Sequence, residues 1–343
     1  MLAIPSFSGN ERDLSRWLLG RLPSMGFDSK LDAAGNVVAR WGRGQRHLAL
    51  VGHLDTVPGV IPVRREGDRL FGRGAVDAKG PLAAAITALM MLPSAIDARF
   101  SLIGAVDEEG SSSGARHLQT QQPPDELVIL EPSGWDAITL GYKGSLRIDY
   151  RLSQPMSHGA GPSPSAGDRA VAFVRRLQDH ATNASPSPPV GEARGGGAFN
   201  RLDVRILHMS AENDGMEDLA RLQVGLRLPL GCDIATLERT IRGWADGGEL
   251  VVEYADPAVK ADKNTPLVRA FVQAIREQGG TPRFKLKTGT SDMNILAPAW
   301  GCPAVAYGPG DSRLDHTPDE AIDFSEFQRG IAVLRSTLSV LAA

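Results

Sequence analysis

Acidic and imidazole side chains follow several apolar segments of this sequence at the points where those segments end. The segments are HLALVG, FSLIGAV, LVIL and PAVAY, and a further apolar stretch, PLAAAITALMML, is preceded by GRGAVDAKG. The polar residues beside these stretches are His53, Asp55, Asp77, Glu108, Glu109, Glu131 and His316. Ligands of open α/β sheets gather outside the carboxyl ends of the strands. We therefore expect these side chains to meet at one sheet edge, although they lie up to about 260 residues apart.

Carboxylates that crowd together repel one another and become protonated unless a positive charge lies among them. No dense cluster of lysine and arginine accompanies them in the sequence, so a divalent metal is the simplest source of that charge. The candidate ligands are His53, Asp77, Glu109, Glu131 and His316. Five ligands are too many for one tetrahedral zinc ion and suit two zinc ions that share a carboxylate. Glu108 is left over, and a free carboxylate beside such a site can act as a general base.

Strands alternate with helices in the part of the chain that carries most of these residues. The predicted strands are 37–41, 47–52, 100–106 and 127–130, and the predicted helices are 11–22, 81–92 and 114–121. The helix at 81–92 is apolar on all sides, which is typical of a buried helix. This alternation predicts an α/β fold with a mostly parallel sheet that is flanked by helices.

The middle of the chain has a different pattern. Predicted strands at 145–152, 201–209, 219–228 and 249–254 alternate with helices at 166–180 and 234–245, and 183–198 reads as a loop. The order β-α-β-β-α-β predicts a small α+β domain. The first pattern then resumes with helices at 266–278, 290–296 and 325–342 and strands at 283–287 and 303–307. We predict a catalytic domain of residues 1–142 and 257–343, interrupted by an inserted domain of residues 143–256.

Composition excludes several classes of protein. The chain has 343 residues, of which 42% are hydrophobic and 22% charged, a globular balance that excludes a disordered chain or a coiled coil. A net charge of −3 gives no basic field for nucleic acid or an anionic membrane, and no apolar run is long enough to span a bilayer. The N-terminal residues do not resemble a signal peptide, and the two cysteines form no disulfide framework, so we expect a cytoplasmic protein.

The motifs HLDTVPG, GRGAVDAKGPLAA, DEEGSSSGAR, LEP, GTSD and GPGDSRLDHTPDE together resemble those of the M20 peptidases, the di-zinc aminoacylase/carboxypeptidase family. They stand in the family's order and cover nearly the whole chain. The resemblance implies a zinc-peptidase-like catalytic domain, an inserted domain that serves as a lid and in dimerisation, and a homodimer. It also implies two zinc ions per subunit, which cobalt can replace.

The resemblance also implies a role for each motif residue. One zinc ion would be bound by His53 and Glu131 and the other by Glu109 and His316, with Asp77 as the bridge. These assignments would make the five residues one di-metal site.

Three further residues would assist the reaction. Asp55 would accept the free ring N–H of His53 and fix its tautomer. Glu108 would take a proton from the attacking water and pass it to the leaving amine. His158 of the inserted domain would stabilise the oxyanion, often from the partner subunit.

Within the family, GYKGS, KTGTSDMN and GPGDSRLDHTPDE resemble the hydrolases that release lysine or ornithine from an amino-group carrier protein in lysine and arginine biosynthesis. The cleaved amide there joins the α-amino group to the side chain of the carrier's C-terminal glutamate. Arg227 and Lys287, together with Lys143, would suit substrate carboxylates. Asp292 and Asp311 would suit a cationic lysine side chain.

Other interpretations remain open for this sequence. A small N-acyl amino acid could be the substrate, which would make the protein an N-acetylornithine or N-acyl-amino-acid deacetylase, or a dipeptidase. A metal-dependent phosphoesterase or a non-catalytic metal-binding protein could use a similar ligand set. Arg227 could be an exposed strand arginine, and Asp292 could simply favour a helix dipole.

Overall fold

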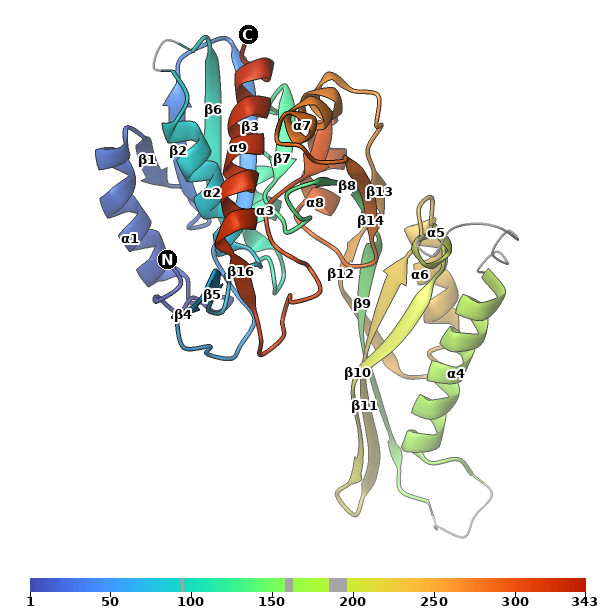
Figure 1. Cartoon of the computed structure of the whole chain (residues 1–343). Coiled ribbons are helices and arrows are strands. Elements are labelled where there is room, and N and C mark those ends of the chain that lie inside the picture. Colours follow the sequence, from blue (N-terminus) through green and yellow to red (C-terminus); the bar gives the residue numbers. More distant parts are fainter. Residues whose placement is uncertain (94–95, 158–162, 185–195) are drawn as a thin grey trace. The chain divides into compact units, whose positions relative to one another are not determined.

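The computed structural model describes residues 1–93, 96–157, 163–184 and 196–343 (Figure 1). The chain divides into two compact units, which are described separately. The first unit comprises Met1–Gly141, Lys260–Lys285 and Ser291–Ala343, and the second comprises Tyr142–Val259 and Leu286–Thr290.

The helices of the first unit are α1 (Arg12–Arg21), the 3₁₀ helix η1 (Leu22–Met25), α2 (Lys79–Met90), α3 (Ser113–Leu118), α7 (Pro266–Glu277), α8 (Met293–Trp300) and α9 (Phe324–Leu341). Its main sheet contains β1 (Asp28–Leu31), β2 (Val37–Gly42), β3 (Arg46–His53), β6 (Ala98–Ala105), β7 (Glu126–Ile129), β8 (Ala137–Tyr142), β13 (Val259–Lys260), β14 (Arg283–Lys287) and β15 (Ala304–Ala306). A small second sheet contains β4 (Arg64–Glu66), β5 (Arg69–Phe71) and β16 (Ala321–Asp323).

The main sheet is parallel at its centre and antiparallel toward its edges. Its strand order is β1-β2-β6-β3-β7-β15-β8-β13, and β14 also pairs with β8. Strands β6, β3, β7 and β15 run parallel, whereas β1, β2 and β8 pair antiparallel with their neighbours. The predicted mostly parallel sheet is therefore confirmed, and the carboxyl ends of its four central strands lie at the same edge.

Helices cover this sheet because their apolar faces need burial. Helix α2 is buried along most of its length, with Pro81 in its first turn, and it packs on β3 and on α9 (Figure 1). Helix α7 packs against α9, and it begins at Thr265, whose hydroxyl accepts the main-chain N–H of Val268. None of the helices within the described ranges is both long and apolar enough to cross a membrane.

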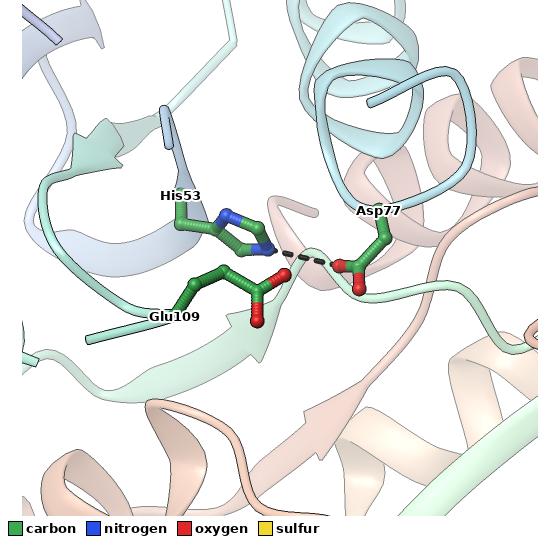
Figure 2. Close-up of side chains that lie close together, drawn as sticks. All are labelled: His53, Asp77 and Glu109. Carbon is green, nitrogen blue, oxygen red and sulfur yellow. Dashed lines mark hydrogen bonds and ion pairs between the residues drawn. The ribbon is translucent and has the colours of Figure 1, made fainter. Parts of the chain in front are cut away.

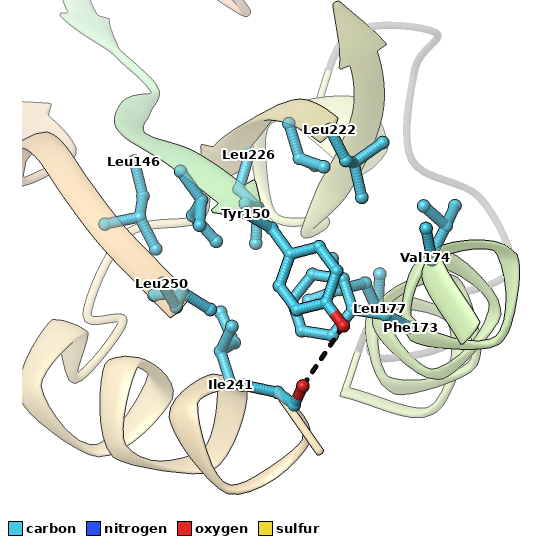
Figure 3. Packing of buried hydrophobic residues seen from close by; sticks show 14 of the residues in the cluster. Leu146, Tyr150, Phe173, Val174, Leu177, Leu222, Leu226, Ile241 and Leu250 are labelled. Atoms are coloured by element: carbon cyan, nitrogen blue, oxygen red, sulfur yellow. Dashed lines mark hydrogen bonds between the residues drawn. The ribbon is translucent and has the colours of Figure 1, made fainter. Parts of the chain in front are cut away.

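The second unit is built on one antiparallel sheet in the order β10-β11-β9-β12. Its elements are β9 (Gly144–Pro155), α4 (Ala166–Ala184), α5 (Gly196–Phe199), β10 (Asp203–Asn213), β11 (Glu217–Leu228), α6 (Ile234–Gly243) and β12 (Glu249–Asp256). In its core, the ring of Tyr150 stacks on Phe173 with 4.6 Å between centroids, and its hydroxyl donates to the carbonyl of Ala245 (Figure 3).

Several predicted boundaries were wrong, and short local contacts explain them. The predicted loop at 183–198 contains the end of α4 and most of α5, and its residues 185–195 lie outside the described residues. The predicted helix at 290–296 begins only at Met293, because the Ser291 hydroxyl and the Asn294 amide hold the preceding turn. Strands β1 and β8 were missed, since neither shows a clear alternation of polar and apolar residues.

Candidate metal centre

The predicted ligands converge at the carboxyl ends of the central strands. His53 is the last residue of β3, and Asp77 lies in the loop before α2. Glu109 follows β6, Glu131 follows β7, and His316 lies in the long loop after β15. His53, Asp77 and Glu109 each offer a ligand atom within 4.8 Å of the others, and their side chains point toward one another (Figure 2). Together these residues form a candidate metal-binding site.

Asp77 lies between the two imidazoles. Its Oδ1 atom is 3.0 Å from Nε2 of His53, and its Oδ2 atom is 3.0 Å from Nε2 of His316. The same nitrogen of His316 is 2.7 Å from Glu109, and that of His53 is 3.6 Å from Glu131. One oxygen of Asp77 therefore faces each imidazole, and Glu131 lies near His53 while Glu109 lies near His316.

The glycines of GRGAVDAKG allow the tight loop that presents Asp77. Gly74 has φ +86°, a conformation that favours glycine, and its carbonyl accepts the N–H of Gly80 at 3.1 Å. A Cβ atom on Gly80 would lie only 2.1 Å from the carbonyl oxygen of Ala75. A larger residue at position 80 would therefore push the start of α2 away from the loop.

Asp55 contacts both the imidazole of His53 and the acidic loop. The Nδ1 atom of His53 donates to the main-chain carbonyl of Asp55 at 2.9 Å, while the nearer carboxylate oxygen is 3.6 Å away. A carbonyl oxygen can only accept, so Nδ1 carries the proton and Nε2 faces the site. The fully buried carboxylate instead accepts the main-chain N–H groups of Glu108 and Glu109, each at 3.0 Å, and the Ser8 hydroxyl. Asp55 therefore fixes the acidic loop as well as the histidine.

The two imidazoles supply the positive charge that the carboxylates need when no metal is bound. Burial opposes a charge on His53, but hydrogen bonds with Asp55 and Asp77 raise its pKa well above the usual value. Hydrogen bonds to Asp77 and Glu109 raise the pKa of His316 to about 10. Burial opposes ionisation of Asp77, yet its contacts with His316 and His53 hold its pKa far below the usual value. This set of imidazole nitrogens and carboxylate oxygens attracts cations and therefore fits divalent metal ions.

Metal binding to this site should release protons. A pKa of about 10 keeps His316 protonated at pH 7.5, hydrogen bonds raise the pKa of His53 as well, and a metal binds only the neutral imidazole. We expect zinc to displace protons from the site, including the one on His316. The apparent affinity for zinc should increase as the pH rises to about 10, because His316 loses its proton over this range.

Titration calorimetry of metal-free protein in two buffers of different ionisation enthalpy would measure this release. His316→Ala should release about one proton fewer than the wild-type protein. Equal binding enthalpies in both buffers would contradict the expected protonation of the imidazoles.

Glu108 differs from its neighbours because its carboxylate makes no hydrogen bond or ion pair with any residue that the structure describes. Burial raises the pKa of Glu108 well above the usual value, and the negative charges of Glu131, Glu109 and Asp292 raise it further, against the effect of His53. The preceding residue, Asp107, has φ 63°, a left-handed conformation that is uncommon outside glycine and recurs at functional sites. This carboxylate is therefore available to hydrogen-bond a water molecule or a substrate.

Two residues that the sequence analysis missed hold the ligand loops together. The buried carboxylate of Glu320 accepts the main-chain N–H groups of Val76, at 2.9 Å, and of Asp77, at 3.1 Å. It also pairs with Arg73 at 2.8 Å, and Arg73 donates to the carbonyl of Thr317. These contacts connect the loop that carries Asp77 to the loop that carries His316. The sequence feature that could have identified Glu320 is its position in HTPDE, four residues after His316.

Replacing Glu320 should weaken metal binding. Glu320→Gln removes the charge that pairs with Arg73 and loosens the main chain at Asp77, and such supporting contacts are typically worth about 10- to 100-fold in metal affinity. We expect the zinc dissociation constant, measured by chelator competition, to rise within that range, with kcat largely restored at saturating zinc. Glu66→Gln, on the exposed strand β4, is the matched control. A zinc affinity within twofold of the wild-type value would show that Glu320 does not position the site.

The predicted substrate residues are less closely gathered. Arg227 and Lys287 belong to the second unit, where the Arg227 guanidinium donates to the hydroxyl of Thr290 at 2.9 Å. His158 lies outside the described residues. Asp292 belongs to the first unit, is 2% exposed, and stands close enough to Glu108 for its charge to raise the pKa of that group.

Two further charged residues considered for substrate binding have other partners. The ammonium group of Lys143 is buried and contacts the carbonyls of Ala198 and Arg201 and the carboxylate of Asp203. These contacts hold the ammonium group of Lys143 within the second unit. The carboxylate of Asp311 pairs with the guanidinium of Arg313.

Comparisons of sequence identify a family and relatives of this chain. A family model described as peptidase family M20/M25/M40 matches residues 49–340. A LysW-lysine hydrolase of Deinococcus radiodurans is 44% identical over 99% of this chain and 94% of its own length. A LysW-lysine/LysW-ornithine hydrolase of Saccharolobus islandicus is 31% identical over 84% of this chain and 79% of its own length.

Solved structures show the same fold at low sequence identity. An M20 family metallo-carboxypeptidase of Sulfolobus solfataricus superposes with a TM-score of 0.84 and 18% identity, over 98% of this chain and 96% of that one. A tripeptidase of Staphylococcus aureus has a TM-score of 0.76 and 19% identity, over 99% and 95% of the two chains. These structures therefore share the fold of this chain.

Proposed function

This chain belongs to peptidase family M20/M25/M40, and on that premise we propose that it releases lysine or ornithine from an amino-group carrier protein by hydrolysing an amide bond. The bond would join the α-amino group of the amino acid to the side chain of the carrier's C-terminal glutamate. The observation that supports this chemistry is the position of Asp77. Its two carboxylate oxygens each face an imidazole, and the unpaired carboxylate of Glu108 belongs to the same group of charges. Relatives of that name that are 44% identical over 99% of this chain and 31% identical over 84% of it support the substrate.

Two zinc ions, or cobalt ions in their place, would be held by five residues of the first unit: His53 and Glu131, Glu109 and His316, with Asp77 between the pairs. When bound, such ions polarise a carbonyl group and make water acidic enough to attack at neutral pH. Glu108 would take the proton from the attacking water and deliver it to the nitrogen of the leaving amino acid. The raised pKa of Glu108 favours this task, because a group that holds a proton more tightly is a stronger base.

The inserted unit would complete the site in this proposal. His158 would stabilise the negative charge that develops on the carbonyl oxygen, and Arg227 and Lys287 would bind the carboxylates of the substrate. Asp292 would accept the charged side chain of lysine or ornithine. The buried position of Asp292 at the start of α8 supports this role, because a buried carboxylate gains most from a cationic partner.

We also propose that the protein is a cytoplasmic homodimer that associates through the inserted unit. Strand β10 lies at the edge of its sheet, and Ile206, Leu207 and Met209 on this strand are 37–46% exposed. Exposed apolar residues on an unpaired strand edge are typical of an interface. Cys232 and Cys302 are both free thiols, which suits a reducing compartment.

Amino-acid release from three substrates at matched zinc concentration tests the proposed function. The substrates are the carrier protein conjugated to lysine or ornithine, N-acetylornithine and N-succinyl-diaminopimelate. We expect kcat/KM for the carrier conjugate to exceed that for the others by at least about 100-fold, since the whole carrier contributes binding energy. Preference for an acetylated or succinylated amino acid would instead make the protein a deacylase of the same family. Hydrolysis of p-nitrophenyl phosphate alone would contradict amide hydrolysis altogether.

A further inference from the structure

A cavity of the first unit lies along one face of the main sheet, over β1, β2, β6 and β3. Its volume is about 410 Å³, which is within the range of small-molecule sites. The titratable side chains of its lining are Lys30, Asp32, Arg40, His47, Arg99 and His117. None of the residues that line it is one of the candidate metal ligands, and six residues of β3, roughly 20 Å, separate His47 from His53.

The sheet register places the cations of this cavity along a diagonal on one face. Arg99 on β6 pairs with His47 on the parallel strand β3, and Arg40 on β2 pairs with Ser101, two residues beyond Arg99. Lys30 on β1 pairs with Val38, two residues before Arg40. Because alternate residues of a strand point to the same face, these side chains share one face of the sheet. An anion among them would lower the repulsion between these exposed positive charges.

The carboxylates nearby are already occupied. Asp32 accepts the main-chain N–H groups of Ala34 and Asn36 and the side-chain amide of Asn36, and Asp125 accepts the main-chain N–H of His47. By contrast, the side chains of Lys30, Arg40 and Arg99 make no ion pair or hydrogen bond with any residue that the structure describes. Three permanent positive charges therefore remain available on this lining.

Neutral donors complete the lining. The indole Nε1 atom of Trp300 is buried and has no hydrogen-bond partner within the described ranges, although a buried donor without a partner is unfavourable. The ring of His47 contacts the Ser101 hydroxyl at 2.8 Å. Burial and the positive charges of Arg99 and Arg40 lower the pKa of His47, against the charge of Asp125, so this imidazole is neutral at pH 7 and cannot add to the repulsion.

We propose that this cavity binds a small organic phosphate, with its phosphate group among Lys30, Arg40 and Arg99. Planar guanidinium groups bind phosphate oxygens in pairs, and lysine adds a further point charge. The indole N–H of Trp300 would donate to the ligand. The apolar side chains of Val38, Ile103 and Leu118 also line the cavity and would contact the organic part. The site is independent of the metal centre and of the reaction proposed for it.

Calorimetric titration of the zinc-loaded full-length protein with glucose 6-phosphate and with inorganic sulfate would test the proposal. Both probes bind zinc weakly, so the metal centre stays loaded. We expect saturable binding of glucose 6-phosphate with a dissociation constant below about 1 mM. Arg40→Gln/Arg99→Gln should weaken the binding of glucose 6-phosphate at least tenfold, and Trp300→Phe should weaken it severalfold. Binding should also change the tryptophan fluorescence of the wild-type protein, and Trp300→Phe should remove part of that change.

The matched control is Arg12→Gln/Arg16→Gln, which removes the same charge from the exposed face of α1 and should bind the sugar phosphate as tightly as the wild-type protein. All variants should keep kcat/KM for amide hydrolysis within twofold. The proposal would be overturned if the wild-type protein showed no saturable binding. It would also be overturned if Arg40→Gln/Arg99→Gln bound as the control does, or if sulfate bound as tightly as the sugar phosphate.

Discussion

Glu108→Ala is expected to lower kcat at least about 10³-fold while the protein still binds two zinc ions per chain. The carboxylate makes no hydrogen bond or ion pair with the described residues that hold the site together, so its removal should spare the ligands. What is lost is the group that moves the proton from water to the leaving amine, together with the position of that water. Metal content by atomic emission and kcat at saturating zinc are the two measurements.

Glu108→Gln distinguishes the loss of the base from the loss of side-chain volume, because the amide has the size of the carboxylate but not its basicity. Both variants should be similarly inactive, and Glu212→Gln, on the exposed strand β10, should be fully active. Activity within tenfold of the wild-type value in both Glu108 variants would refute the general-base role. Loss of zinc from both would instead assign Glu108 to the metal ligands.

Asp77→Ala is expected to abolish two-metal binding, leaving no more than about one weakly held zinc ion per chain. Asp77 contacts both His53 and His316 at 3.0 Å, and it is the carboxylate that lies between them. Without it, each imidazole loses its shared partner, and a bridging oxygen is no longer available to offset the repulsion between two cations. Activity should fall to background even when zinc is added in excess.

The isosteric change Asp77→Asn is a control for misfolding of Asp77→Ala, since it removes the charge of the side chain and keeps its shape. Asp28→Ala, on the exposed strand β1, is the control for the loss of a carboxylate elsewhere. Circular dichroism should show the wild-type secondary structure for all three variants. Two tightly bound zinc ions with normal turnover in Asp77→Asn would contradict the bridge.

Much of the candidate site could be predicted from sequence because its residues follow strands. The apolar segments before His53, Glu109 and Glu131 became β3, β6 and β7, and their parallel pairing carries those side chains to one edge. His316 could be placed there for the same reason, since its loop follows β15. Each of these positions depends on local periodicity and on the general topology of parallel sheets.

Other features depend on contacts that no local pattern specifies. Arg73 and Glu320 are 247 positions apart, and each reads in the sequence as a charged loop residue. The main-chain direction after β3 decides which oxygen of Asp55 meets the ring of His53, and here it is the carbonyl oxygen. The buried Trp300 indole, likewise, gains significance only from the cavity that it lines.

The sequence by itself determined the α/β class, the inserted β-α-β-β-α-β element order and the set of side chains able to bind metal, since strand periodicity and residue type are local properties. The tertiary structure alone decided which oxygen of Asp77 faces which histidine, which atoms secure the acidic loop, and that three cations share one face of the same sheet. Those outcomes arise from register and packing between distant segments, whose free energies depend on distances that only the folded chain defines.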